Sequence, residues 1–206
     1  KPMSIANARN PLYTIFLKLH ELDLLIVGAG EVGHEKLSFI LKSSPAARIT
    51  LVAPDISPKV RDLLAGGNYR VTIHQRPFVA TDVIEQDLVI AATDIPELNE
   101  SVRAAARSHR RLVNVADSPS LCDFYLGSIV TKGQLKVAIS TNGKSPTLAK
   151  RMRQMLEAVL PENIDDLLQN LKIIRDRLQG DFAYKVAQLN ELTASLVESR
   201  EDQTKA

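Results

Sequence analysis

Three glycines near residue 30 have the spacing of a dinucleotide-binding loop. They lie in the segment Gly28-Ala29-Gly30-Glu31-Val32-Gly33, which follows an apolar run and precedes a helical pattern. The first glycine permits a tight turn, the second lets the backbone approach a pyrophosphate, and the third lets the helix pack close to the strand. The phosphate charge then rests on the helix N-terminus. The loop therefore predicts cofactor binding by Gly28, Gly30, Glu31, Val32 and Gly33.

The second apolar run of the chain bears on which dinucleotide is bound. It ends in Pro54 and Asp55, and an acid about 20 residues beyond the glycines commonly holds the adenosine ribose. Asp55 either reaches this ribose or caps the helix that begins near Ser57, and the sequence leaves both open. No arginine occupies the strand end to hold a 2′-phosphate, although Lys59 and Arg61 lie nearby. NAD is therefore favoured over NADP.

Polar side chains end two later apolar runs. Thr93 follows the fourth run, and Asn114 and Asp117 lie at the end of the fifth. Because ligands bind at the carboxyl ends of strands in a doubly wound sheet, we expect Thr93 and Asn114 to line the cofactor crevice. Asp117 would face the reacting end as a catalytic group, or would cap a turn with Ser118-Pro119. The spacing alone does not decide between these two roles.

The elements that must position these residues form an α/β pattern. Short β-branched runs alternate with helical segments, and such unbroken apolar runs suit strands that are covered on both faces, as in a parallel doubly wound sheet. The expected strands cover residues 24–27, 49–52, 71–73, 88–91 and 112–115. The expected helices cover residues 31–41, 57–64 and 96–108, with Asp94 as the cap of the last. The apolar segment Leu12–Leu19 is expected to pack as core filler.

The pattern changes after residue 116. Residues 124–131 and 134–140 predict an antiparallel hairpin around a Lys132-Gly133 turn. Three helical patterns follow, starting near Ser145, at Ile164 and behind a capping Asp181. We therefore expect three parts: a nucleotide-binding domain of residues 1–116, a hairpin region of residues 117–144 and a small helical domain of residues 145–206.

Composition narrows the classes of protein. The 26 basic and 24 acidic residues are nearly balanced, which argues against a nucleic-acid partner. No apolar run is long enough for a membrane span, and the single cysteine, Cys122, fits a reducing compartment. A cytoplasmic location is expected. The four histidines lack ligand spacing, so no standing metal site is expected.

These motifs together resemble the family of precorrin-2 dehydrogenases, which form the N-terminal part of siroheme synthases. The resemblance lies in five ordered blocks: 28–33 followed by 35–36, 52–54, 91–94 with 98–99, 114–117 and 140–146. It implies a homodimer with a Rossmann domain, a dimerisation region and a helical domain. It also implies oxidation of precorrin-2 to sirohydrochlorin with NAD, and places the catalytic aspartate at Asp117. Some members also insert Fe²⁺ to give siroheme, a ferrochelatase (lyase) activity.

The resemblance further implies a substrate with many carboxylates. Such a ring needs cations and backbone donors, because burying unpaired carboxylates is costly. The expected substrate-binding residues are Ser140, Thr141, Asn142, Gly143, Lys144, Ser145, Lys150 and Arg153. The family often has serine and glycine where this chain has Thr141 and Asn142. Asparagine tolerates a left-handed backbone, so the loop can keep its shape.

Two roles are open for Asp117 in this chemistry, and two functions for the chain. Asp117 acts as a general base or stabilises positive charge that develops on the pyrrole ring, and the base role is preferred. The alternative function is a non-enzymatic NAD-sensing module, which begins with the same glycine loop. Such a module has less need for Asp117 together with a hydroxyl-rich loop and adjoining cations.

Overall fold

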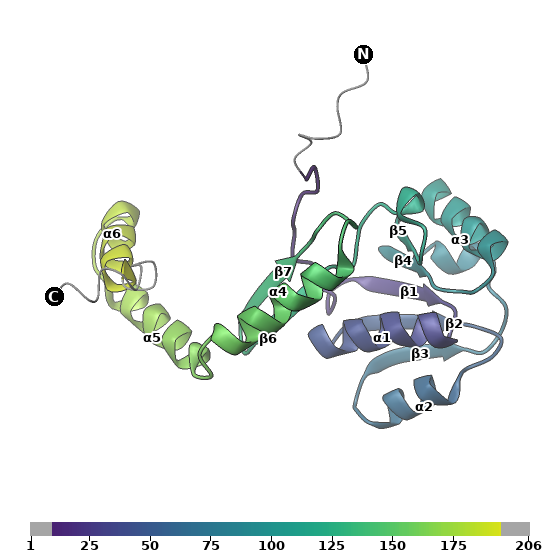
Figure 1. Ribbon diagram of the computed structural model, residues 1–206, viewed down its shortest axis with the longest axis horizontal. Coiled ribbons are helices and arrows are strands. Elements are labelled where there is room, and N and C mark those ends of the chain that lie inside the picture. The colour runs from purple at the N-terminus through teal and green to yellow at the C-terminus, as the bar shows by residue number, and fades with distance from the viewer. Residues whose placement is uncertain (1–9, 195–206) are drawn as a thin grey trace, which may run out of the picture. The chain divides into compact units, whose positions relative to one another are not determined.

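A computed structural model describes residues 10–194 of the chain (Figure 1). The first part contains, in order, β1 (Asp23–Val27), α1 (Glu31–Ser43), β2 (Arg48–Val52), α2 (Pro58–Ala65), β3 (Arg70–His74), η2 (Ala80–Val83), β4 (Leu88–Ala91), α3 (Pro96–Ser108), β5 (Leu112–Val115) and η3 (Pro119–Leu121). The second part contains β6 (Ser128–Lys132), β7 (Leu135–Ile139), α4 (Pro146–Val159), α5 (Ile164–Arg177) and α6 (Phe182–Leu192). The elements η2 and η3 are short 3₁₀ helices.

The first five strands form one parallel sheet in the order β3-β2-β1-β4-β5. Val27 at the end of β1 is level with Val52 of β2 and with Ala91 of β4, and Ala91 is level with Val115 of β5. The carboxyl ends of these strands therefore share one edge, where ligands bind in such sheets. The predicted α/β doubly wound sheet is confirmed.

The core lies on both faces of this sheet. Leu24 and Ile26 of β1 belong to a buried cluster with α1 and α2, whereas Leu25 and Val27 belong to a second buried cluster with α3. Alternate residues of a strand point to opposite faces, so β1 is covered twice and has no polar side. Full burial of such a side chain contributes roughly 1.5–3 kcal/mol. This explains why the sequence shows unbroken apolar runs.

The described chain divides into two compact units. One holds residues up to 128 together with residues 138–149, and the other holds residues 129–137 and the chain from residue 150. In the second unit, Lys132 Nζ donates to the carbonyl oxygen of Leu160 (2.5 Å) and Asp165 accepts the Gln134 N–H (2.7 Å). Asp181 caps α6 as expected, at 2.8 Å from the Tyr184 nitrogen. The three-part division at residues 116 and 144 stays a prediction.

Three local expectations are wrong. Residues 12–18 are not core filler: Tyr13 is 90% exposed and Phe16 63%, and only Leu19 packs against the core. Asp94 does not cap α3, because Ile95 occupies the cap position and no side chain caps the helix. The hairpin begins at Ser128 rather than residue 124, because Phe124 and Leu126 pack against the core cluster before any strand pairing starts.

Among residues 10–194, no helix is long and apolar enough to cross a membrane.

Candidate functional site

The glycine loop joins β1 to α1 at the carboxyl edge of the sheet. Gly28 has a φ of +108°, and a Cβ there would lie 2.3 Å from the carbonyl oxygen of Ala92. A Cβ on Gly33 would lie 2.0 Å from the carbonyl oxygen of Gly28. A Cβ on Gly30 would meet no atom within 4 Å. The first and third glycines are thus needed for packing, whereas the second has open space in front of it.

The N-terminus of α1 is built to accept an anion. Gly30 is the cap residue and has no side chain to bond the first turn. The first N–H groups of a helix have no partner within it, and within residues 10–194 no acceptor is found for those of Glu31, Val32 and Gly33. These donors and the open space at Gly30 fit the pyrophosphate of a dinucleotide, so the residues present suit that cofactor.

The loop between β2 and α2 lies against the glycine loop. Ser57 caps α2 by accepting the Val60 N–H at 3.4 Å, and its own N–H donates to Ala29 at 3.1 Å. The alternative that Asp55 caps this helix is therefore wrong. Pro54 and Asp55 are exposed at the end of β2, and contact of Asp55 with the ribose stays a prediction.

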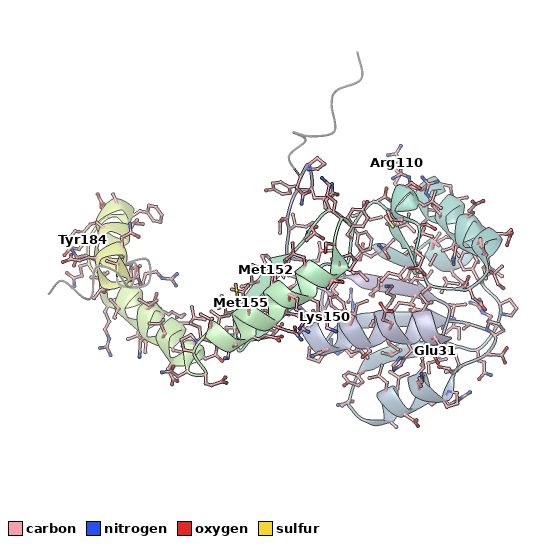
Figure 2. The ribbon with its side chains drawn as sticks, in the orientation of Figure 1. Glu31, Arg110, Lys150, Met152, Met155 and Tyr184 are labelled. Atoms are coloured by element: carbon pink, nitrogen blue, oxygen red, sulfur yellow. The ribbon has the colours of Figure 1, made fainter. Side chains whose placement is uncertain are left out.

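An ion pair joins the first turns of α1 and α2. Lys59 Nζ lies 2.8 Å from Glu31 Oε2, and both side chains are exposed. The hydrogen bond from Lys59 and its charge lower the pKa of Glu31 below the ordinary value. Figure 2 shows Glu31 at the N-terminal end of α1. Glu31 thus places a negative charge beside the expected phosphate site, held towards α2.

Asp117 lines a pocket at the end of β5. The pocket has a volume of about 320 Å³ and is lined by Thr93, Asp94, Pro96, Asn99, Glu100, Val115, Ala116, Asp117, Ser118 and Leu121. Asp117 has a φ of +56°, which is uncommon for a residue with a side chain. Its carboxylate accepts no hydrogen bond from the residues that the structure describes. The following turn is closed by the Ser118 N–H on the Val115 carbonyl (3.3 Å), so Asp117 does not act as a turn cap.

The opposite wall of the pocket depends on Asn99, a residue that the sequence analysis did not assign to the site. The Asn99 side-chain oxygen accepts the Thr93 N–H (3.2 Å) and lies 2.8 Å from its hydroxyl, while the Asn99 amide donates to the Thr93 carbonyl (2.9 Å). Asn99 is 7% exposed. The sequence carried no signal for this role, because an asparagine in a helix is usually exposed.

Asn114 lies beneath the site. Its side chain is 6% exposed, and its amide donates to the carbonyl oxygen of Phe124 at 2.8 Å. The N–H groups of β5 are bonded by the same segment: Val113 donates to Asp123 (3.0 Å) and Val115 to Cys122 Sγ (3.2 Å). Burial raises the pKa of the Cys122 thiol. Asn114 thus anchors the chain after β5, and its contact with the cofactor stays a prediction.

The loop before α4 is organised by its own hydroxyls. Ser140 Oγ accepts the Asn142 N–H (3.2 Å), Thr141 Oγ1 accepts the Ser145 N–H (3.1 Å), and Ser145 Oγ accepts the Leu148 N–H (3.1 Å). Each hydroxyl keeps its own proton to donate elsewhere. Asn142 and Gly143 have φ values of +53° and +73°, so asparagine adopts the left-handed backbone that the sequence analysis expected it to tolerate.

The basic side chains predicted to bind the substrate differ in whether they already have an ion-pair partner. Arg153 Nη1 is held by both oxygens of Glu157, at 2.6 and 2.8 Å. Lys144 and Lys150 have no side-chain partner among the described residues, and Figure 2 shows Lys150 on α4. Lys144 and Lys150 are thus unpaired within the described chain, whereas Arg153 must loosen its hold on Glu157 before it can bind another anion.

No group of three or more histidine, cysteine or acidic residues within residues 10–194 is arranged to hold a metal ion.

The chain is similar in sequence to two protein-family models and to several curated proteins. A family model of NAD(P)-binding domains matches residues 15–128, and a model of the central region of sirohaem biosynthesis proteins matches residues 132–158. Siroheme synthase 1 of Klebsiella pneumoniae is 38% identical over 167 residues, covering 80% of this chain and 34% of that protein. The siroheme synthase of Pseudoalteromonas atlantica is 37% identical over 170 residues, covering 82% of this chain and 36% of that protein.

A solved structure of SirC, precorrin-2 dehydrogenase, is also similar. It matches with a TM-score of 0.70 at 27% identity, covering 88% of this chain and 89% of that one. The chain spans about a third of the length of the curated relatives. The NAD(P)-binding model covers more than half of the chain, and the sirohaem model follows in order. The chain therefore belongs to the NAD(P)-binding family found in the sirohaem biosynthesis proteins.

Proposed function

We propose that the protein oxidises precorrin-2 to sirohydrochlorin with NAD, in siroheme biosynthesis. The observation that carries this proposal is Asp117: an exposed carboxylate, unbonded within the described chain, in a left-handed backbone beside a pocket at the carboxyl edge of the sheet. A left-handed aspartate costs stability. Family membership and the likeness to a precorrin-2 dehydrogenase support the choice of precorrin-2 as the substrate.

The residues divide the chemistry between them. NAD, when bound, supplies the hydride acceptor. Gly28, Gly30 and the first turn of α1 hold its pyrophosphate, and Thr93 forms the pocket wall near the reacting end. The oxidation also releases one proton from the substrate. Asp117 accepts that proton on a carboxylate oxygen as a general base, since no neighbouring donor among the described residues occupies it.

The carboxylates of the tetrapyrrole need a different surface from the pocket. The pocket lining includes three acids, Asp94, Glu100 and Asp117, and no basic residue. Repulsion would keep a polyanion's carboxylates away from it. We assign them to the hydroxyls and backbone donors of residues 140–145 and to Lys144, Lys150 and Arg153. The acidic pocket would then receive the ring at the position that loses hydrogen.

Anaerobic incubation of the purified protein with precorrin-2 and NAD tests the reaction. We expect the absorbance of sirohydrochlorin to rise together with equimolar NADH, and no change when NAD is omitted. Binding of NAD without any oxidation would contradict the enzyme and match the NAD-sensing alternative. Fe²⁺ added in a second stage tests whether the protein also acts as a ferrochelatase. For that activity we propose that Asp117 accepts the protons that leave the ring nitrogens.

We further propose that the protein is a cytoplasmic homodimer built largely by residues 118–140. The hairpin of β6 and β7 is two-stranded, which is marginal without cover. On α4, Met155 and Val159 are 50% and 73% exposed and Met152 is 37% exposed, and Figure 2 shows Met152 and Met155 on this helix. Light scattering at micromolar concentration should report twice the 22.7 kDa of the chain. A measured mass equal to that of one chain would contradict the proposed dimer. It would not bear on the proposed oxidation, which the anaerobic assay tests separately.

A further inference from the structure

The basic residues near the end of β2 bear on the choice between NAD and NADP. The ribose 2′-position of a bound dinucleotide lies at this strand end, and a 2′-phosphate there requires a cation. Lys59 and Arg61 of α2 are close in sequence, and Arg76 follows β3, whose last residue, His74, is level with Val52 at the end of β2. Each of these cations must be either available to the phosphate or engaged elsewhere.

Lys59 is engaged by Glu31. The two atoms of the pair are 2.8 Å apart, and the Ser57 N–H holds the same loop to Ala29 at 3.1 Å. The Glu31 carboxylate therefore lies between the first turns of α1 and α2. The pyrophosphate site is at the first of these turns, and the strand that carries the ribose site leads into the second.

Arg76 is engaged more firmly. Its guanidinium bonds both oxygens of Asp82, at 2.6 and 2.9 Å, and Asp82 also accepts the Val79 N–H at 3.0 Å. The Asp82 side chain is only 9% exposed, and the Arg76 guanidinium lowers the pKa of that carboxyl. Drawing Arg76 towards a phosphate would leave a nearly buried carboxylate without its cation, which is costly.

Arg61 is on another side of α2. It lies two residues after Lys59, which places it about 200° around a helix of 3.6 residues per turn. Because Lys59 is directed at Glu31, Arg61 is directed away from α1. Of the three cations, Lys59 is the one that a 2′-phosphate could recruit, and only by displacing Glu31.

We propose that Glu31 sets the cofactor preference: its carboxylate neutralises Lys59 and repels a 2′-phosphate, so that NAD is bound and NADP is rejected. This inference rests on the proposed NAD site. It gives Glu31 the excluding role that an acid at the end of β2 commonly has, while Asp55 is free to contact the ribose hydroxyls. Both members of the pair are more than half exposed, so the pair adds little to stability and can be altered without unfolding the protein.

Calorimetric titration with NAD and NADP at low ionic strength tests the role of Glu31. In Glu31→Gln, Lys59 is released and the repelling charge is gone. The ratio of NADP affinity to NAD affinity should rise by about tenfold or more, the scale of one charge-assisted hydrogen bond to a phosphate. Adding Lys59→Met to Glu31→Gln should abolish the gain. Salt should reduce it.

Glu35→Gln is the matched control. Glu35 lies one turn further along α1, is exposed to the same degree as Glu31 (73% against 74%) and pairs with a lysine at 2.9 Å. Its change should leave both affinities unaltered. An unchanged ratio of the two affinities in Glu31→Gln, or a wild type that binds NADP as tightly as NAD, would overturn the assignment. A wild type that binds neither dinucleotide would overturn the proposed function together with it.

Discussion

The glycine loop after β1 and the Asp117 turn after β5 lie at the same edge of one sheet but are built in different ways. In the glycine loop, backbone packs on backbone, and a Cβ on Gly28 or Gly33 would collide with a carbonyl oxygen. At the Asp117 turn, side chains hold the backbone: Cys122 and Asp123 bond β5, and Asn99 fixes Thr93 across the pocket.

This difference separates residues that the fold requires from residues that it only tolerates. Gly28 and Gly33 are necessary for close packing, so their presence says little about the ligand by itself. Gly30 and Asp117 are not required for packing in this way. Gly30 faces open space, and Asp117 has a strained backbone and a carboxylate without a hydrogen bond from the described residues. The proposed function therefore depends on Gly30 and Asp117 more than on Gly28 and Gly33.

Gly33→Ala should have the largest effect. Its Cβ would lie 2.0 Å from the Gly28 carbonyl oxygen. Because that oxygen is a backbone atom and the Cβ is bonded directly to the backbone, neither can yield without moving α1 away from β1. We expect a loss of about 3 kcal/mol or more, the upper range for overpacking. In thermal unfolding this corresponds to a Tm lower by about 6–12 °C.

Gly30→Ala is the control for this comparison. Its Cβ would meet nothing within 4 Å, so the Tm should stay close to that of the wild type while NAD affinity falls. Equal destabilisation by both substitutions would show that the loop is uniformly packed, and the distinction between its glycines would be lost. Unchanged NAD affinity in a folded Gly30→Ala protein would place the pyrophosphate elsewhere.

Asp117 should show the reverse behaviour, with a small effect on folding and a large one on turnover. Asp117→Asn keeps the shape and removes the base, so turnover should fall by roughly 10²-fold or more while NAD affinity barely changes. Asp117→Gly relieves the left-handed strain but makes the unfolded chain more flexible, two opposing effects of about 1 kcal/mol each. Its Tm should therefore stay near the wild-type value.

Oxidation of precorrin-2 at the wild-type rate by Asp117→Asn would make the catalytic assignment wrong. A large loss of stability in Asp117→Gly would instead show that the carboxylate supports the fold. As a positive contrast, Lys150→Ala, on the proposed carboxylate-binding surface, should raise the apparent KM for precorrin-2 before turnover suffers.

The sheet was largely predictable from sequence because its strands are buried on both faces. The expected runs at residues 24–27 and 49–52 differ from the observed β1 and β2 by one residue at the start. A doubly covered strand must be apolar throughout, so its ends coincide with the return of polar residues. The glycine spacing was equally informative, because close backbone contacts exclude other residues.

The parts that sequence did not predict depend on which partner a side chain finds. Asn99 lies in a helix where its type suggests an exposed position, and its bonds to Thr93 become visible only in three dimensions. Leu12–Leu19 is as apolar as a strand, yet most of it is exposed. Phe124 and Leu126 alternate like strand residues but pack as a loop, because the β5 edge is already bonded by Cys122 and Asp123.

Substitution of Asn99 should have the smallest effect, and it tests whether side chains hold the backbone around the Asp117 pocket. Asn99→Ala removes the acceptor of the Thr93 N–H and the donor to the Thr93 carbonyl, and leaves both groups unpaired beside a pocket into which water can enter. Water can partly replace the lost bonds, so we expect a loss of about 2 kcal/mol in urea unfolding, within the range for an unpaired buried group. Ser101→Ala, an exposed change on the same helix, should alter stability by less than about 0.5 kcal/mol.

The loosened Thr93 in Asn99→Ala should also raise the KM for NAD without a matching fall in kcat, because Asp117 and its turn are untouched. A variant that loses kcat instead would show that Asn99 supports Asp117 through the pocket, and that the two walls act as one unit.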